Sequence, residues 1–361
     1  MDYDGRQARM QQQLSSAGLG AMLVTRLPNI RYLCGFTGSA GALLVSHRNS
    51  TFFTDGRYKE QAEKEVQGSR IVVGRKPPLA LAADWLANHR NLGLKVLGFE
   101  PQHVSVADYS QLSDVLRVQV RLRKAPPLIE SARIVKDPDE IGLLRSAISV
   151  GEGLFDVALK AIRPGVPETQ VAAEMEYAAR RAGAEGMSFE TIIASGPRSA
   201  LPHGRASAAE IPRKGFVVCD FGIILAGYCS DMTRTVHVGK LSAEMQRMYD
   251  SVREAQEAAI QAVKPGVNAG KIDSAARQVL TKRGFGKYFT HSTGHGVGLE
   301  IHEMPRIAAR QTEPLLAGMV ITIEPGVYIP ETGGVRIEDM VLVTDKGCKV
   351  LTQTSKELVE I

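Results

Sequence analysis

The sequence predicts a two-domain protein of mixed α/β structure whose second domain consists of two similar halves. Three observations lead to this prediction. The chain has 361 residues, more than one domain of roughly 150 residues. Strand and helix patterns alternate along its first part. A motif at residues 161–166 returns at residues 262–267, which are 101 positions further on.

Composition places the chain among ordinary globular proteins, with 44% hydrophobic and 23% charged residues. No run approaches the ~20 apolar residues of a membrane helix, and residues 1–5 lack a signal-peptide pattern. The net charge of +5 is spread along the chain, and the four cysteines form no C-x-x-C pair. We therefore expect a cytoplasmic protein with reduced thiols that binds neither membrane nor nucleic acid.

The first domain is predicted to alternate between short apolar strands and helices. Strands are expected at residues 21–24, 41–45, 51–54 and 71–73, and a helix at 58–66. The pattern breaks at Pro126 and Pro127, which neither a helix nor a central strand accommodates. This break predicts a domain of residues 1–127 followed by a domain of residues 128–361.

The second domain is predicted to open with a long amphipathic helix. Asp137 is a suitable N-cap, Pro138 suits the first helical position, and Glu140 completes a capping box. Apolar residues then recur at helical spacing, and the helix is expected to stop at residues 163–165.

The repeated motif indicates that the second domain is duplicated. The offset of 101 also carries Val171 onto Ile272 and Gly183 onto Gly284. A long helix precedes each copy, the second starting near Ser242, and a pair of strands follows each copy. A chance match of two helix ends is the alternative. Two halves about a pseudo-twofold axis fit better than a solenoid, because the copies are too few.

Each half also carries two acids after an apolar strand. Asp220 and then Asp231 follow the first copy, and Glu324 and then Glu338 follow the second. If each segment is a hairpin, its two carboxylates can share one face, and all four can meet where the halves face each other.

Such a cluster needs positive charge, because buried unpaired carboxylates are costly. Arg234 and Arg336 could supply it in a structural ion-pair network. Metal ions are favoured instead, because His291, His295 and His302 lie within twelve residues among glycines. Four acids and a histidine suffice for two divalent ions that hold a hydroxide and polarise a carbonyl for hydrolysis.

Two competing chemistries find less support in the sequence. The glycines of residues 294–298 have the wrong spacing for a G-x-G-x-x-G nucleotide loop. No G-x-S-x-G motif marks a serine nucleophile.

Together these residues resemble the proline-specific metallopeptidases of the pita-bread fold, namely prolidase and aminopeptidase P. Residues 35–41 (Gly-Phe-Thr-Gly-Ser-Ala-Gly) and 54–58 (Thr-Asp-Gly-Arg-Tyr) are similar to their N-terminal creatinase-like α/β domain. Residues from about 128 resemble their catalytic domain with pseudo-twofold halves. The resemblance also implies a homodimer.

Position by position, the resemblance implies a ligand set and its surroundings. The metal ligands would be Asp220, Asp231, His295, Glu324 and Glu338, and the ions manganese, with cobalt or zinc as alternatives. Asp231 and Glu338 match bridging carboxylates, and Glu324 matches the ligand that transfers protons. His203 and His302 match histidines at the reacting intermediate, His291 lines the proline pocket, and Arg336 steadies a ligand carboxylate.

The implied activity is hydrolysis of X-Pro peptide bonds in short peptides. Arg306 matches an arginine that in some prolidases holds a dipeptide's carboxylate, which favours an Xaa-Pro dipeptidase. Residues 35–41 also occur in relatives of aminopeptidase P, so an Xaa-Pro aminopeptidase is the alternative. Arg198 stands where relatives often carry asparagine. A non-catalytic pita-bread module, a creatinase-like amidinohydrolase and a methionine aminopeptidase are disfavoured.

Overall fold

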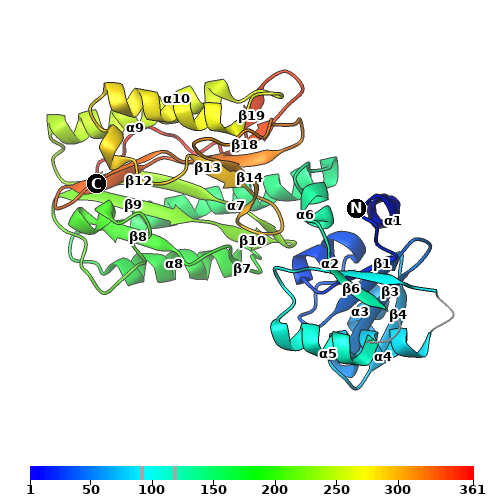
Figure 1. Ribbon diagram of the computed structural model, residues 1–361. Coiled ribbons are helices and arrows are strands. Elements are labelled where there is room, and N and C mark those ends of the chain that lie inside the picture. Colours follow the sequence, from blue (N-terminus) through cyan, green and yellow to red (C-terminus); the bar gives the residue numbers. More distant parts are fainter. Residues whose placement is uncertain (90–92, 117–119) are drawn as a thin grey trace. The chain divides into compact units, whose positions relative to one another are not determined.

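The computed structural model describes residues 1–89, 93–116 and 120–361. Within it the chain divides into two compact units, Met1–Arg133 and Ile134–Ile361, drawn from blue to cyan and from green to red in Figure 1. The proline pair predicts a boundary after residue 127. Helix α6 (Leu128–Arg133) lies in the first unit instead, because Ile129 is buried there and Arg133 Nη1 donates a 2.6 Å hydrogen bond to Asn29 Oδ1.

The first unit contains a six-stranded mixed sheet in the order β4-β3-β2-β1-β5-β6. Its strands are β1 (Ala21–Val24), β2 (Ala42–Ser46), β3 (Ser50–Asp55), β4 (Arg70–Gly74), β5 (Val96–Phe99) and β6 (Arg121–Lys124). Its other helices are α1 (Tyr3–Ser16), α2 (Leu27–Cys34), α3 (Lys59–Glu65), α4 (Pro78–Asn88) and α5 (Val106–Leu116). All four residues of β1 are buried, as expected of a central strand covered on both faces. The predicted strands and helix are therefore present, with a 3₁₀ turn (Gly56–Tyr58) leading into α3.

The second unit has four long helices and thirteen strands among the described residues. The helices are α7 (Pro138–Ala161), α8 (Glu168–Arg181), α9 (Ala243–Ala262) and α10 (Ala269–Lys282). The strands of the first half are β7 (Gly186–Met187), β8 (Ile192–Ser195), β9 (Gly215–Phe221), β10 (Ile223–Leu225), β11 (Tyr228–Cys229) and β12 (Met232–Val238). Those of the second half are β13 (Gly294–Gly296), β14 (Glu303–Ile307), β15 (Val320–Ile323), β16 (Gly326–Ile329), β17 (Gly333–Arg336), β18 (Asp339–Val343) and β19 (Cys348–Val350). Short 3₁₀ turns, η3 (Gly196–Ala200) and η4 (Gly286–Tyr288), interrupt the loops.

Helix α7 begins and ends as its sequence predicts. Asp137 accepts a hydrogen bond from Glu140 N (2.9 Å), and Glu140 accepts one from Asp137 N (3.0 Å), which completes the capping box. The helix ends at Ala161, directly before Arg163-Pro164-Gly165. Ser242 likewise caps α9, the helix predicted before the second copy of the motif.

The duplication is present in the backbone. Gly165 and Gly266 both adopt positive φ, at 83° and 80°, which glycine tolerates without strain. Gly165 N donates to Ile211 O and Gly266 N to Leu315 O, both at 2.8 Å. The same turn thus follows α7 and α9, and each half then adds a second helix and an antiparallel sheet.

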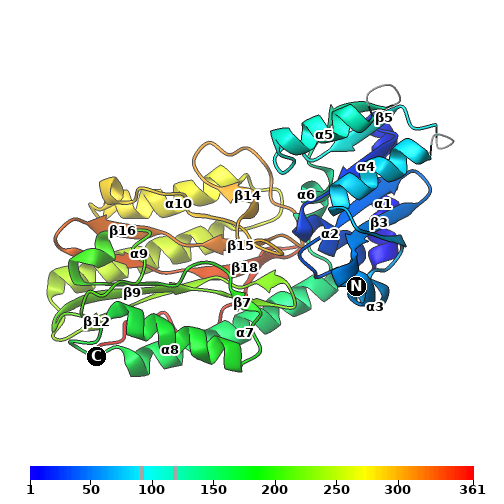
Figure 2. The ribbon, with the colours of Figure 1, turned by 90° about the horizontal axis from the view of Figure 1, so that it is seen from below.

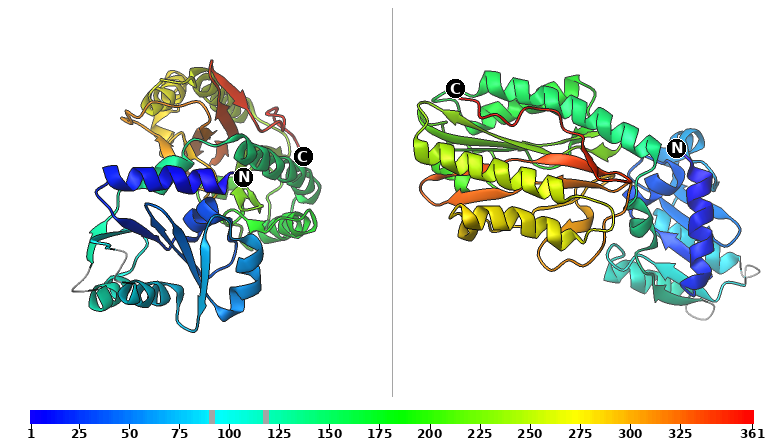
Figure 3. Two further views of the ribbon diagram at one scale, coloured as in Figure 1. Left: turned by 90° about the vertical axis from the view of Figure 1, so that its right-hand side faces the viewer. Right: turned by 90° about the horizontal axis from the view of Figure 1, so that it is seen from above.

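The helices of the second unit lie outside its strands. In Figure 1, α9 and α10 lie on one side of the strands and α7 and α8 on the other. Figures 2 and 3 show the same layers from other directions. The sheets β12-β9-β8 and β14-β13-β15-β18-β19 adjoin at β12, where Glu338 N donates to Thr233 O at 3.1 Å. Among the described residues, no helix is long and apolar enough to cross a membrane.

Candidate metal centre

The four predicted acids lie at corresponding ends of two antiparallel strand pairs. Asp220 is near the end of β9 and Asp231 directly precedes β12, with which β9 pairs. Glu324 directly follows β15 and Glu338 directly precedes β18, with which β15 pairs. In each half, an acid at the end of one strand therefore lies close to an acid at the start of the neighbouring strand.

The donor atoms of this cluster are close together. One ligand atom from each of Asp231, His295 and Glu338 lies within 4.8 Å of the others. His295 Nε2 is 3.5 Å from Asp231 Oδ2 and 3.6 Å from Glu324 Oε1. Two ligands of one ion with bonds of about 2.1 Å can be up to about 4.2 Å apart, so these spacings suit a shared cation.

His295 is oriented to offer a free nitrogen to the acids. It lies in β13, and its Nδ1 is 3.0 Å from the backbone oxygen of Gly296, to which it donates. Burial lowers the pKa of His295 to about 4, so its ring is neutral. A backbone carbonyl on one ring nitrogen leaves the other with its lone pair directed at the carboxylates, as in metal-binding histidines.

The cluster holds more negative charge than its protein neighbours neutralise. Burial, followed by the neighbouring carboxylates, raises the pKa values of Asp231 and Glu338 well above their usual range. Burial raises the pKa of Glu324 to about 8 against the attraction of Arg336. Asp220 Oδ1 is buried and accepts no hydrogen bond from any described residue. An oxygen-rich donor set with one imidazole, repulsive when empty, fits divalent cations.

Arg336 contacts the cluster through the side chain of Asp220. From the end of β17 its Nη2 lies 2.6 Å from Asp220 Oδ2. Its Nη1 donates to Tyr328 OH at 2.6 Å, and its Nε donates to Thr233 Oγ1 at 3.2 Å. Thr233 Oγ1 in turn donates to Glu338 Oε2 at 2.7 Å. No local pattern in the sequence signals a role for Tyr328 or Thr233.

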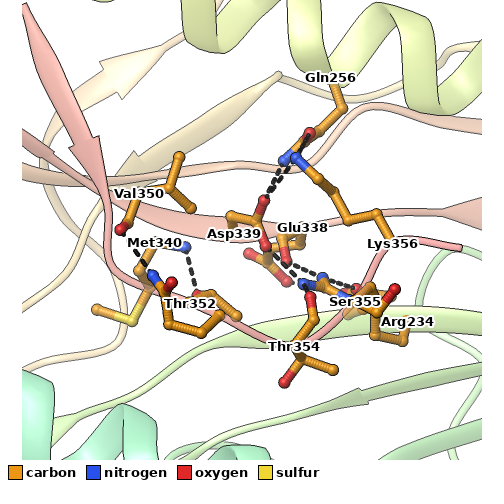
Figure 4. Close-up of polar contacts among 12 residues, drawn as sticks. Arg234, Gln256, Glu338, Asp339, Met340, Val350, Thr352, Thr354, Ser355 and Lys356 are labelled. Atoms are coloured by element: carbon orange, nitrogen blue, oxygen red, sulfur yellow. Dashed lines mark hydrogen bonds and ion pairs between the residues drawn. The ribbon is translucent and has the colours of Figure 1, made fainter.

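Arg234, the second candidate cation, does not pair with the four acids. Its Nη2 lies 2.7 Å from Asp339 Oδ1, and both side chains are buried. Figure 4 shows this ion pair beside Glu338, with Gln256 and Lys356 also contacting Asp339. Asp339 directly follows Glu338 in an otherwise apolar strand, which is the signal that could have identified it.

The three other predicted histidines lie around the cluster. His291 Nε2 is 2.8 Å from Tyr328 OH, and burial, reinforced by Arg336, lowers its pKa to about 4. The His302 ring lies 4.4 Å from the His295 ring, centroid to centroid. His203 is exposed in the loop after η3. Burial is the largest cause that lowers the pKa of His302, and the charge of His203 is the next.

Arg306 reaches the same face of the sheet as His295. The two residues are directly opposite each other in the antiparallel pair β13–β14, and such residues project to one side. Arg306 is exposed, and the register changes only beyond this pair, between His295 and Gly296.

Comparison with known proteins gives two adjacent family matches. Residues 142–345 match the metallopeptidase family M24, and residues 6–135 match the creatinase/prolidase N-terminal domain. An Xaa-Pro dipeptidase of Pyrococcus horikoshii is 39% identical over 94% of this chain and 95% of its own length. The chain belongs to metallopeptidase family M24.

Solved structures share the whole fold. An Xaa-Pro dipeptidase from Bacillus anthracis superposes with a TM-score of 0.94 and 40% identity, covering 99% of this chain and all of its own. An X-Pro aminopeptidase from Thermotoga maritima reaches 0.90 with 34% identity, covering 98% of this chain and all of its own. The expected creatinase-like domain and pita-bread catalytic domain are thereby confirmed, and the protein is a peptidase.

Proposed function

We propose that the chain is an Xaa-Pro dipeptidase of the prolidase type, which hydrolyses the bond before proline in short X-Pro peptides. The observation that carries this proposal is the position of Arg306 opposite His295, beside the acid cluster. A guanidinium there can pair bidentately with a dipeptide's C-terminal carboxylate. The 39% identical dipeptidase of Pyrococcus horikoshii supports the same substrate class.

An Xaa-Pro aminopeptidase that acts on longer peptides is the second candidate. The structural similarity to the Thermotoga maritima aminopeptidase favours it. A non-catalytic pita-bread module is disfavoured, because all five predicted ligand residues are present. Four of them lie close together, since His295 is near Asp231, Glu338 and Glu324.

The proposed ligands are Asp220, Asp231, His295, Glu324 and Glu338, which would hold two divalent ions. Four carboxylates favour manganese or cobalt, with zinc as a further possibility. When bound, such a pair supplies a hydroxide nucleophile near neutral pH and polarises the scissile carbonyl. Asp220 Oδ1 has no hydrogen-bond partner among the described residues, and His295 Nε2 faces Asp231 and Glu324, so both atoms can serve as donors to a cation.

The chain's own residues are proposed to bind the substrate and move its protons. Glu324 accepts the proton of the attacking water and delivers it to the proline nitrogen, which, being a tertiary amide nitrogen, carries no N–H of its own. His203 and His302 hydrogen-bond the oxygen on which negative charge develops. His291, held by Tyr328, lines the pocket for the proline ring.

The protein is also proposed to be a cytoplasmic homodimer. All four cysteines are free, as in proteins kept in a reducing compartment. The dimer follows from the family resemblance, and light scattering behind a sizing column would test it.

The proposed specificity can be tested by comparing the hydrolysis of two peptides. Hydrolysis of Ala-Pro and of an X-Pro-Pro tripeptide should be measured with chelator-treated enzyme and after restoring manganese. Manganese-dependent cleavage confined to the dipeptide is expected of a dipeptidase, whereas preference for the tripeptide would establish the aminopeptidase. If neither peptide is cleaved with manganese, cobalt or zinc, the proposal is wrong.

A further inference from the structure

His203 lies in a loop whose two ends meet on one buried carboxylate. Glu168, the first residue of α8, is completely buried. Its Oε1 accepts hydrogen bonds from Ser195 N (2.8 Å) and Ser195 Oγ (2.9 Å). Its Oε2 accepts from Ser207 N (3.2 Å) and Ser207 Oγ (2.8 Å). Glu168 therefore joins both ends of the segment 195–207, which carries His203.

Arg198 completes the base of this loop. Its Nε lies 3.0 Å from Glu168 Oε2, and its Nη2 donates to the backbone oxygen of Arg205 at 2.8 Å. The guanidinium thus spans the loop from one side to the other and places a positive charge against the buried carboxylate. About a third of the Arg198 side chain is exposed, so the residue can be replaced without opening the core.

The tip of the loop is tied to the metal centre by other residues. Arg336 Nη1 donates to Pro202 O at 3.1 Å, while its Nη2 holds Asp220. Gly334 N donates to Ser199 Oγ at 2.8 Å. His203 follows Pro202 directly, so its position depends on the anchored base and on the Arg336 contact at the tip.

The second half of the domain shows that the fold itself does not require this carboxylate. An offset of 101 places Ala269 at the position of Glu168. Ala269 N donates to Glu313 O at 3.0 Å, as Glu168 N donates to Ala209 O at 3.0 Å. The same turn therefore forms with alanine, and the carboxylate is specific to the half that carries His203.

We propose that Glu168 and Arg198 are positioning residues that hold His203 over the metal centre and so set its contribution to turnover. This inference rests on the proposed function and deepens it. A histidine that stabilises developing charge is effective only when its loop is already ordered, because small displacements of such a group cost about 100-fold in rate.

The kinetic test compares Arg198→Ala, Arg198→Lys and the control Arg205→Ala in the manganese-loaded enzyme with Ala-Pro. Arg205 belongs to the same loop, but its side chain forms an exposed ion pair with Glu190. Arg198 donates to the backbone oxygen of Arg205, which Arg205→Ala retains. We expect Arg198→Ala to lower kcat by about 10- to 100-fold with little change in KM. Arg198→Lys should recover part of the loss, and Arg205→Ala should stay within about twofold of wild type.

A double-mutant cycle separates positioning from general loss of structure. In a His203→Ala background, adding Arg198→Ala should cause little further loss of kcat, because the group that Arg198 positions is already missing. An equal loss of kcat in both backgrounds would overturn the proposal, as would full activity of Arg198→Ala.

Hydrogen exchange gives a readout that does not depend on activity. In metal-free protein, Arg198→Ala should increase amide exchange in residues 196–207 while α8 and β9 keep their protection. Unchanged exchange in that segment would contradict the anchoring role. If wild-type enzyme cleaves no X-Pro peptide, the proposed function fails, and the exchange result alone then decides whether the contact of Arg198 with Glu168 orders the loop.

Discussion

The guanidinium of Arg234 lies 2.7 Å from Asp339 Oδ1, and only 2% and 1% of these side chains are exposed. Arg234 also donates to the backbone oxygens of Glu338 (2.6 Å) and Thr354 (2.7 Å), as Figure 4 shows. Arg234 comes from β12 of the first half and Asp339 from β18 of the second. The ion pair therefore joins the two halves directly beside a proposed metal ligand.

Removing one partner of this pair should destabilise the protein strongly. Arg234→Met would leave Asp339 buried with Lys356 and Gln256 as its remaining partners among the described residues, which typically costs about 3–5 kcal/mol. Urea unfolding of the second unit measures this loss. Arg283→Met is the matched control, because Arg283 and Glu254 form an exposed ion pair whose loss costs about 1 kcal/mol or less. Equal effects of the two substitutions would contradict the structural role assigned to Arg234.

Replacing Glu338, one of the proposed metal ligands, should weaken the metal-loaded protein and stabilise the metal-free protein. Glu338→Gln removes a proposed ligand, so bound metal and turnover should be lost. It also removes a buried carboxyl whose ionisation burial and the neighbouring carboxylates oppose, so Tm in chelator should rise, by about 2–4 °C per kcal/mol for a domain of this size. Metal analysis and thermal unfolding with and without manganese measure both effects.

The control for that experiment is Asp345→Asn, an exposed acid in the turn after β18. It should leave metal content and both Tm values unchanged. Normal turnover of Glu338→Gln would show that the proposed set of metal ligands is wrong.

Replacing Arg306 should distinguish the two candidate specificities. A hydrogen bond to a charged group contributes about 1.5–3 kcal/mol, so Arg306→Ala should weaken dipeptide hydrolysis by about 10- to 100-fold in kcat/KM. Tripeptide hydrolysis should change little, since the second proline moves the carboxylate away. Arg306→Lys keeps the charge without the bidentate geometry and should fall between the two. A uniform loss on both peptides would argue against a carboxylate clamp.

Thiol labelling provides a check on the first unit that is independent of catalysis. Burial raises the pKa of the Cys34 thiol to about 12, so at pH 8 only about one molecule in ten thousand carries the reactive thiolate. Raising the pH from 7 to 9 should therefore leave Cys34 unlabelled by iodoacetamide in folded protein. Cys348 is only partly buried and should react first, which peptide mass spectrometry can establish. All four cysteines should react in denaturant, and labelling of Cys34 at the rate of Cys348 under native conditions would show that its burial is wrong.

Local signals in the sequence were sufficient for elements whose cause lies within a few residues. The capping box of Asp137 and Glu140 depends on two hydrogen bonds inside one helical turn. Gly165 and Gly266 occupy positions where the backbone adopts a positive φ, which favours glycine. An acid after each apolar strand, such as Asp220 or Glu324, places its charge at the edge of a core wherever that strand packs.

The sequence by itself therefore determined the class of fold, the duplication and the residues that could bind metal. Only the tertiary structure decided how those residues are paired. In the folded protein, Arg336 pairs with Asp220 and Arg234 pairs with Asp339. Residues 128–133 belong to the first unit, and Glu168 binds the start of the loop that carries His203. Partners more than a hundred positions apart, as in both arginine pairs, meet only through the alignment of two sheets. No local pattern encodes that alignment, because it results from the packing of the whole domain.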